Sequence, residues 1–268
     1  MKAQKVFSNW LTKISLYLSN KIVNFLTQSL SISQWDNRLL GLSSFPIKTI
    51  IDIGANEGQS CRKLRSIFPN ATIYAFEPSH LAYSKLETLA KRYQNFYYFN
   101  LALGQENSQV AFYEHSYFTQ SSSLLKTTDK CEENYPFLAN QNTITIEQTT
   151  LDTFFELKNL DQEILIKIDV QGAEDIVIQG GKKVLDQAMG CIVEISIYPA
   201  YKQQANFEAI FNELTVLGYK FVGTIDQVSS PNGTVQYFDA VFIKEKFLAS
   251  LREAPHCTEG QCRDGAYK

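Results

Sequence analysis

The chain has 268 residues and a formal net charge of −3, with 44% hydrophobic and 20% charged residues. This is the composition of a soluble globular protein with a sizeable core, and the small negative charge argues against general nucleic-acid binding. The five cysteines are few, odd in number and scattered, which indicates reduced thiols in a cytoplasmic protein.

The first 48 residues differ from the rest in charge, because they hold six Lys and Arg residues against one Asp. Polar residues interrupt this segment too often for a transmembrane span. We expect residues 1–45 to form a helical extension that packs on the main domain, and weak peripheral contact with a membrane or a partner is the alternative. The apolar positions recur at helical spacing: Phe7, Leu11, Ile14, Leu18, Ile22 and Phe25.

A buried strand, a glycine turn and a helix follow this extension. The β-branched run of residues 50–53 predicts a strand that is buried on both faces, and residues 59–68 predict a helix. Glycines in the turn between them let the backbone approach a ligand, with N–H groups free to bind it. We therefore predict that the strand end and the turn bind a cofactor through Asp52, Gly54, Ala55, Asn56 and Gly58.

A second strand, over residues 71–76, ends in Glu77-Pro78. An acidic side chain at this place can accept hydrogen bonds from both hydroxyls of a ribose. In a dinucleotide-binding G-x-G-x-x-G turn the second glycine admits a pyrophosphate, but here Asn56 takes its position. The two strand ends thus predict a site for a nucleoside without a pyrophosphate, such as S-adenosylmethionine.

Ser79 is the predicted N-cap of a helix, and residues 96–101 predict a third strand. We expect Asn100 and Ala102, after this strand, to meet the adenine ring. Residues 105–150 are polar, with strand-like pieces at 110–114 and 143–147. We expect residues 119–123 to be a mobile loop in this insertion, which is either a substrate-facing lid or a plain surface excursion.

The fourth strand, residues 164–170, carries Asp169 at its carboxyl end, where open parallel sheets bind ligands. A helix is predicted from there to about Ala188. The fifth strand, residues 191–197, carries Glu194 near its end. Strands at 219–225 and 235–243, joined by a Pro-Asn-Gly turn, predict an antiparallel hairpin, which the dinucleotide fold lacks.

Five segments together resemble the FkbM family of methyltransferases, and the resemblance covers roughly residues 48–243. It implies a class I methyltransferase fold, which is α/β and Rossmann-like: a seven-stranded, mostly parallel sheet with an antiparallel terminal hairpin and helices on both faces. It also implies S-adenosylmethionine as methyl donor and a hydroxyl acceptor on a sugar, a glycan or a natural product. We accordingly expect the methyltransferase domain at residues 46–246, followed by a tail at 247–268. The segments are Asp52-Ile53-Gly54-Ala55-Asn56-Glu57-Gly58, Phe76-Glu77-Pro78, Leu151-Asp152-Thr153-Phe154, Lys167-Ile168-Asp169-Val170-Gln171-Gly172-Ala173-Glu174 and Asp239-Ala240-Val241-Phe242.

Methylation of a hydroxyl requires an acceptor oxygen in line with the donor methyl group and a side chain that takes the hydroxyl proton. Asp169 is the first candidate for this base, and donor binding or helix capping is an equal alternative for it. Glu174 and Glu194 follow. His115 is a weaker candidate, since a lone histidine in an insertion is usually a surface residue. Mg²⁺ on Asp169 and Glu194 is conceivable, but no H-x-H or D-x-D spacing indicates a metal, and we expect none.

Two other functions remain open at this stage. One is a nucleotide-dependent oxidoreductase, against which stand Asn56 and the terminal hairpin. The other is a scaffold that keeps the fold and has lost the reaction. The expected partner is a small-molecule or glycan acceptor, and the sequence does not indicate an oligomeric state.

Overall fold

We analysed a computed structural model, which describes residues 41–158, 160, 163–230 and 232–252. The helix predicted in the N-terminal extension lies outside these residues, as does most of the predicted tail. The helix α10 (Glu245–Arg252) occupies the first part of that tail. Within the described ranges, the cysteines Cys61, Cys131 and Cys191 carry free thiols.

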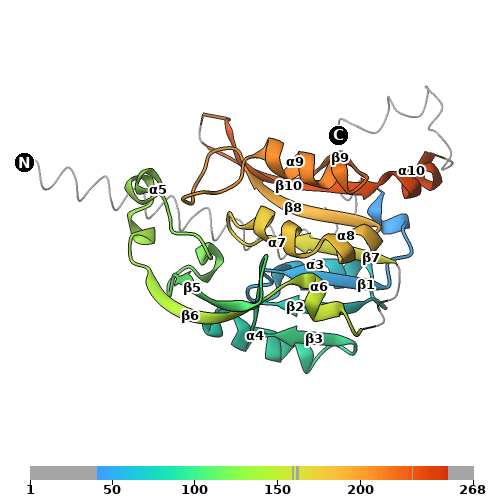
Figure 1. Cartoon of the computed structure of the whole chain (residues 1–268), viewed down its shortest axis with the longest axis horizontal. Coiled ribbons are helices and arrows are strands. Elements are labelled where there is room, and N and C mark those ends of the chain that lie inside the picture. Colours follow the sequence, from blue (N-terminus) through green and yellow to red (C-terminus); the bar gives the residue numbers. More distant parts are fainter. Residues whose placement is uncertain (1–40, 159, 161–162, 231, 253–268) are drawn as a thin grey trace, which may run out of the picture. The chain divides into compact units, whose positions relative to one another are not determined.

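The core of the fold is a seven-stranded sheet with the strand order β3-β2-β1-β7-β8-β10-β9 (Figure 1). All neighbouring strands are parallel except β10, which runs antiparallel to both β8 and β9. This arrangement confirms the predicted class I methyltransferase fold, including its terminal hairpin. The strands are β1 (Thr49–Ile53), β2 (Thr72–Phe76), β3 (Phe96–Phe99), β7 (Ile164–Ile168), β8 (Gly190–Ser196), β9 (Tyr219–Ser229) and β10 (Val235–Lys244).

The register of the sheet brings three strand ends level with one another. Ile53 at the end of β1 pairs with Phe76 at the end of β2 and with Ile168 at the end of β7. The residues that follow these three strands therefore meet at one edge of the sheet, where ligands bind in open α/β folds.

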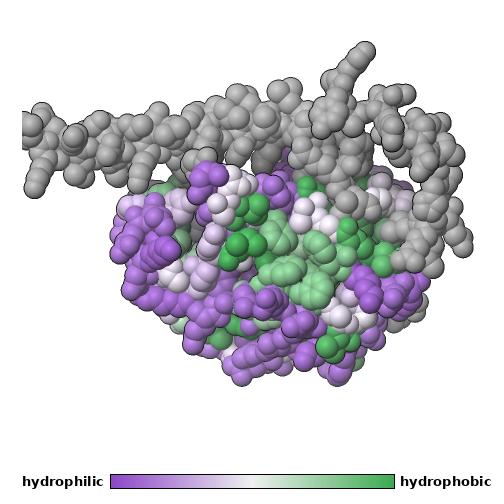
Figure 2. All heavy atoms as spheres, turned by 90° about the horizontal axis from the view of Figure 1, so that it is seen from above, coloured by the Kyte–Doolittle hydropathy of each residue, from purple (hydrophilic) through white to green (hydrophobic). Residues whose placement is uncertain are grey.

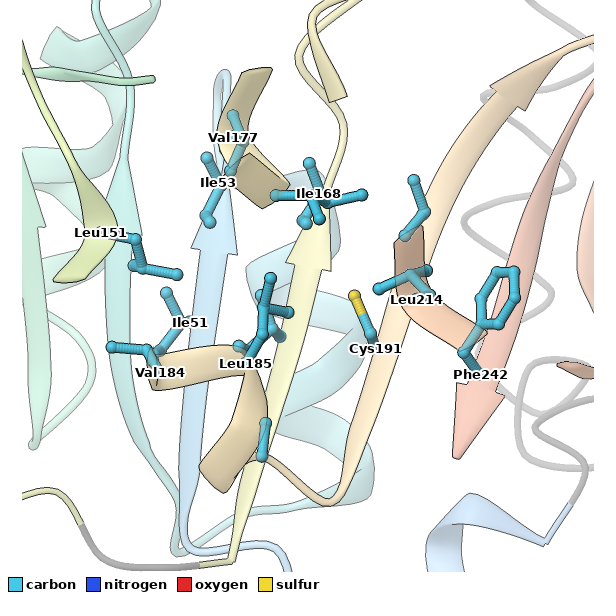
Figure 3. Close-up of a cluster of buried hydrophobic side chains, with 14 of the residues drawn as sticks. Ile51, Ile53, Leu151, Ile168, Val177, Val184, Leu185, Cys191, Leu214 and Phe242 are labelled. Carbon is cyan, nitrogen blue, oxygen red and sulfur yellow. The ribbon is translucent and has the colours of Figure 1, made fainter. Parts of the chain in front are cut away.

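Helices cover both faces of the sheet. The apolar side chains of α7, α8 and α9 pack on the face that carries Ile51, Ile53 and Ile168, and Figure 3 shows this cluster. The opposite face carries α3, because Asp52 of β1 accepts hydrogen bonds from α3, and α4 lies next to it, since Leu89 of α4 packs on Gly58 at the start of α3. Neighbouring residues of a strand point to opposite faces of the sheet. Because helices cover both faces, every residue of β1 and β7 is buried. The helices are α3 (Gln59–Ile67), α4 (His80–Ala90), α6 (Leu151–Phe155), α7 (Glu174–Gly180), α8 (Lys182–Gln187) and α9 (Phe207–Val216).

The single helix predicted to reach about Ala188 is wrong, since the chain forms α7 and α8 with a break at Gly181. A Cβ atom on Gly180 would lie 1.9 Å from the carbonyl oxygen of Gly104. The end of α7 thus contacts the backbone of a distant segment, and only glycine permits that approach.

The polar insertion forms a second, three-stranded sheet with the order β4-β6-β5, in which β6 is parallel to β4 and antiparallel to β5. The predicted loop at residues 119–123 is anchored, because Ser122 and Ser123 are buried and the hydroxyl of Ser123 donates to the carbonyl of Gln171 at 2.7 Å. The insertion therefore contacts the loop that follows β7. Its elements are β4 (Ala102–Leu103), β5 (Ser108–Glu114), η2 (Thr119–Ser121), α5 (Asp129–Asn134), η3 (Pro136–Leu138) and β6 (Asn142–Thr149).

Figure 2 shows an apolar area on the face that lies uppermost in Figure 1, where α9 packs beside β9 and β10. Phe207 of α9 contacts the rings of Phe221 and Phe238 here. In the part of the chain that the structure describes, no helix is both long enough and apolar enough to cross a membrane.

Candidate active site

The turn after β1 is bound to the end of β2. The N–H groups of Gly54 and Ala55 both donate to the carbonyl of Phe76, at 3.0 and 2.9 Å, and the N–H of Asn56 donates to Glu77 Oε2 at 2.8 Å. The N–H of Gly58 donates to the carbonyl of Ala55. The expectation that these N–H groups are free for a ligand is therefore wrong. The turn contributes its shape and the Asn56 side chain, whose amide donates to Thr119 of the insertion.

The two glycines of this turn serve two different contacts. Both have positive φ angles, +80° at Gly54 and +79° at Gly58. A Cβ atom on Gly54 would lie 1.9 Å from the carbonyl oxygen of Asp169, so this glycine lets the ends of β1 and β7 touch. A Cβ atom on Gly58 would lie 2.2 Å from Leu89. We expected Gly58 to leave room for the ligand, but it leaves room for the side chain of Leu89 in α4.

Replacing Gly54 by Ala should destabilise the fold far more than the same change at Gly218, which also has a positive φ but has nothing within 4 Å of its Cβ position. Backbone strain alone should cost roughly 1 kcal/mol at Gly218. The collision with Asp169 should raise the cost at Gly54 to roughly 2–4 kcal/mol. Urea denaturation of both variants measures the difference, and equal losses would contradict the proposed contact.

Asp52 lies beneath the turn and is fully buried. Its Oδ2 accepts hydrogen bonds from Ser60 Oγ at 2.5 Å and Cys61 Sγ at 2.9 Å. Burial raises the pKa of Asp52, and Lys167 acts against this shift. The contacts give Asp52 the role of holding the first turn of α3 against β1.

Glu77 combines deep burial with unused hydrogen-bonding capacity. It is 5% exposed, and its two oxygens each accept one backbone N–H, from Asn56 and from Ser79, both at 2.8 Å. Burial outweighs these two bonds and raises the pKa of Glu77 to about 7. Each carboxylate oxygen can accept a second hydrogen bond. The residue therefore fits the two hydroxyls of a ribose, as S-adenosylmethionine would present them.

Other predicted donor-site residues lie around Glu77. Asn100 donates its side-chain amide to the carbonyls of Glu77 and Pro78, at 2.9 and 2.8 Å, so that it fixes the acidic turn. Ala102 is buried in β4, where it pairs with Gln148. The structure thus brings Gly54, Ala55, Asn56, Glu77, Pro78 and Asn100 to one edge of the sheet, while Ala102 belongs to the second sheet.

A second polar cluster lies at the ends of β7 and β8, beside Asp239 of the neighbouring strand β10. Lys167 is 4% exposed, and its Nζ lies 2.7 Å from Asp169 Oδ2 and 3.9 Å from Asp239 Oδ1. Burial alone would lower the pKa of Lys167, but Asp169, Asp239 and Asp52 together raise it. Burial has the opposite effect on an acid and would raise the pKa of Asp169. The positive charge of Lys167 outweighs burial, so that the pKa of Asp169 is lowered. The pair is therefore an ammonium and a carboxylate.

Gln171 joins Asp169 to Glu194. Its Nε2 donates to Asp169 Oδ1 at 3.0 Å and to Glu194 Oε2 at 2.7 Å. Glu194 also forms a hydrogen bond with Asp169. Burial, Asp169 and Asp239 raise the pKa of Glu194 well above its ordinary value. Burial and the negative charge of Asp169 thus shift Glu194 towards its protonated form, whereas Asp169 stays ionised beside Lys167.

The remaining two candidate bases are enclosed. Glu174 is 2% exposed, and its Oε1 accepts the N–H groups of Val170 and Gly172 at 3.1 and 3.0 Å, so that it caps the turn after β7. His115 is 3% exposed, and neither ring nitrogen has a hydrogen-bond partner. Burial lowers the pKa of His115. The expectation of a surface histidine is therefore wrong.

Several residues of this cluster were not predicted from the sequence. Lys167 was visible as the one polar residue in an apolar strand, and Gln171 lies inside a motif. Tyr201 and Tyr237 had no signal, although burial and nearby carboxylates, Glu194 among them, raise the pKa of both phenols. Across the described residues, no three His, Cys, Asp or Glu side chains are grouped so that they could hold a metal ion.

Comparison with known proteins relates this geometry to a family. The model of the methyltransferase FkbM domain matches residues 52–221. The 2-O-methyltransferase NoeI of Sinorhizobium fredii is 27% identical over 194 residues, which cover 70% of this chain and 78% of NoeI. A fibrillarin-like rRNA/tRNA 2'-O-methyltransferase of Thermoplasma volcanium is 27% identical over 177 residues, 62% of this chain and 68% of that protein.

Among solved structures, the magnesium protoporphyrin IX methyltransferase of Synechocystis PCC 6803 with bound S-adenosylmethionine is similar at 13% identity. The match has a TM-score of 0.42 and covers 81% of this chain and 78% of that one. The family assignment rests on the domain match, which spans more than half of the chain, and on the sheet order described above. The chain belongs to the FkbM family of S-adenosylmethionine-dependent methyltransferases.

Proposed function

We propose that this protein transfers a methyl group from S-adenosylmethionine to a hydroxyl of a neutral small molecule, such as a sugar, a glycan or a natural product, with Glu194 as the base. The observation that carries the proposal is the half-buried pair of Asp169 and Glu194, joined by Gln171. This pair lies next to the donor turn, because Gly54 touches the backbone of Asp169.

The donor side of the site needs few residues. When bound, S-adenosylmethionine supplies an electrophilic methyl group on a sulfonium. Glu77 would accept hydrogen bonds from the ribose hydroxyls, and Asn100 keeps the Glu77-Pro78 turn in place. Asp169, which Lys167 keeps ionised, would face the sulfonium end of the donor with a negative charge.

Glu194 is better suited than Asp169 to act as the base. Both oxygens of Asp169 already accept hydrogen bonds, from Lys167 and from Gln171, and its pKa is lowered. The raised pKa of Glu194 makes its carboxylate the stronger proton acceptor of the two. As the acceptor oxygen bonds to the methyl carbon and the carbon–sulfur bond breaks, the hydroxyl proton passes to the Glu194 carboxylate.

The charges around the pair favour a neutral acceptor. The acidic side chains of Asp169, Glu194 and Asp239 lie together at this edge, and the ammonium of Lys167 is already paired with Asp169. They would repel the phosphates of a nucleic acid. NoeI and the Thermoplasma protein are both named as O-methyltransferases, which supports a hydroxyl acceptor. The second relative is named for rRNA and tRNA, and the charges here argue against that acceptor class.

The test uses the full chain with methyl-labelled S-adenosylmethionine and a panel of monosaccharides, oligosaccharides and hydroxylated natural products. We expect label in an ether that survives mild alkali, since a methyl ester would release methanol. A parallel thermal-shift measurement should show that S-adenosylhomocysteine raises the melting temperature and that NAD does not. Stabilisation by NAD alone would support the oxidoreductase alternative, and donor binding without any methyl transfer would support the inactive scaffold.

A further inference from the structure

The backbone of Gln171 has a conformation that is unusual for a residue with a side chain. Its φ angle is +58°, and Gly172 follows with a φ of +100°. Such angles are unfavourable outside glycine and persist where the surrounding structure enforces them, often at functional sites. Here the enforcing contacts come from three parts of the chain.

The first contacts are those of the side-chain amide. Its Nε2 donates to both carboxyl groups of the proposed catalytic pair, and its Oε1 lies 2.9 Å from the hydroxyl of Tyr201. Glutamine supplies two donors and one acceptor at this reach. Glutamate would put a third carboxylate beside the pair, and an apolar side chain would leave both carboxyl groups without this donor.

The second contacts are those of Tyr201, which is 5% exposed. Its ring packs on Gly172, where a Cβ atom would lie 2.9 Å from the ring carbon Cδ2. Its hydroxyl also lies 3.0 Å from the carbonyl of Ser121 in the insertion. Tyr201 thus holds the amide of Gln171 and the insertion at the same time.

The third contacts join the insertion to the same two residues. Ser123 Oγ donates to the carbonyl of Gln171 at 2.7 Å, and Thr127 forms a β-bridge with Tyr201. The N–H of Thr128 donates to the carbonyl of Ala200 at 2.8 Å. Residues 121–128 of the insertion are therefore docked directly on the residues that hold the carboxyl pair.

From these contacts we infer that Gln171 is a positioning residue for the proposed reaction. It sets the separation of Asp169 and Glu194, and Tyr201 keeps it in place while the insertion is docked. The inference rests on the proposed function for its catalytic meaning, but the effect on the carboxyl pair can be measured without donor or acceptor.

The measurable consequence has a definite sign. The amide donates to carboxylate oxygens, which favours their ionised forms, so its removal should raise the pKa of Glu194 further. Several other titratable groups face Glu194, and of the variants described below only Tyr201→Phe changes one of them. They are Lys167 of β7, Asp169 directly after β7, Glu174 of α7, Asp239 and Tyr237 of β10, and Tyr201.

The variant Gln171→Met keeps the length of the side chain and removes its polar atoms, and Tyr201→Phe removes only the hydroxyl. The matched control is Gln179→Met, since Gln179 also donates to a glutamate, Glu213, at 3.0 Å, but on the exposed surface of α7. Infrared titration of the protonated carboxyl band, assigned by its loss in Glu194→Gln, reports the pKa of Glu194 in the unliganded protein.

We expect Gln171→Met to move this titration to higher pH by about one unit, Tyr201→Phe to move it less in the same direction, and Gln179→Met to leave it in place. With substrates, kcat should fall roughly 10- to 100-fold in Gln171→Met, while affinity for S-adenosylhomocysteine stays within about twofold. An unmoved titration in a folded Gln171→Met variant would overturn the inference. A shifted titration in a protein that methylates no hydroxyl would overturn the proposed function and leave the positioning contact standing.

Discussion

Replacing Glu194 by Gln is expected to lower turnover by roughly 10²–10⁴-fold while donor affinity stays nearly unchanged, because the variant keeps shape and hydrogen bonding but cannot take the hydroxyl proton. The wild-type rate should rise with pH as Glu194 loses its proton, since its pKa is raised by burial and by Asp169. This rising limb should disappear in the variant. Steady-state kinetics over a pH series measure both effects.

Glu156→Gln is the control for this experiment, since Glu156 is exposed at the end of α6. Asp169→Asn is a second comparison with a different expected signature. Asp169→Asn removes the charge that pairs with the buried Lys167. This variant should therefore lose roughly 3–5 kcal/mol of unfolding free energy in addition to its activity. Near-normal turnover in Glu194→Gln, with a large loss in a folded Asp169→Asn protein, would return the role of base to Asp169.

Replacing Glu77 by Ala should weaken S-adenosylhomocysteine binding by roughly 2 kcal/mol or more, which is about 30-fold, because two charged hydrogen-bond acceptors are lost. The pKa of about 7 in the free protein also gives the wild-type affinity a pH dependence. Below pH 7 the carboxyl group holds a proton that ribose binding must displace. Affinity should therefore fall from pH 8 to pH 6 in the wild type and stay flat in the variant.

Calorimetry at several pH values tests this expectation, with Glu57→Ala as the control, since Glu57 lies in the same turn and is exposed. Unchanged affinity in a folded Glu77→Ala protein would show that the ribose binds elsewhere. A pH dependence that survives in the variant would assign the titration to a different group.

The positions of the site residues follow from sequence patterns, because strand ends can be read from runs of apolar residues. The apolar runs before Gly54, Glu77 and Asp169 ended close to where the structure ends β1, β2 and β7. In a parallel sheet this was enough to predict that these residues share one edge. The terminal hairpin was predictable for a similar reason, since its turn residues are local.

The contacts of the same residues could not be predicted, because their partners are distant in the sequence. The N–H groups of Gly54 and Ala55 look free in the sequence, and their acceptor, the carbonyl of Phe76, is identified only by the register of β1 and β2. Gly58 is required by the side chain of Leu89, and Gly180 by the backbone of Gly104. A glycine indicates close approach but does not indicate what approaches it.

Burial of polar residues was the second unpredictable property. His115 and Lys167 are both buried, but only the tertiary structure reveals that the first has no hydrogen-bond partner and the second has carboxylates around it. The cytoplasmic location and the helical extension at residues 1–45 stay predictions.

The two ends of the insertion lie side by side in the second sheet. The chain leaves the main sheet after β3 and returns to it with β7, and between them Ala102 and Gln148 are paired in the parallel β4–β6 contact. When the two ends of a segment are paired with each other, a change in its length alters the entropy of loop closure only slightly. The strands β3 and β7 on either side of the segment then keep their positions. Residues 104–147 can therefore change in length without displacing β3 and β7, provided that the contacts of residues 121–128 with Gln171 and Tyr201 are kept.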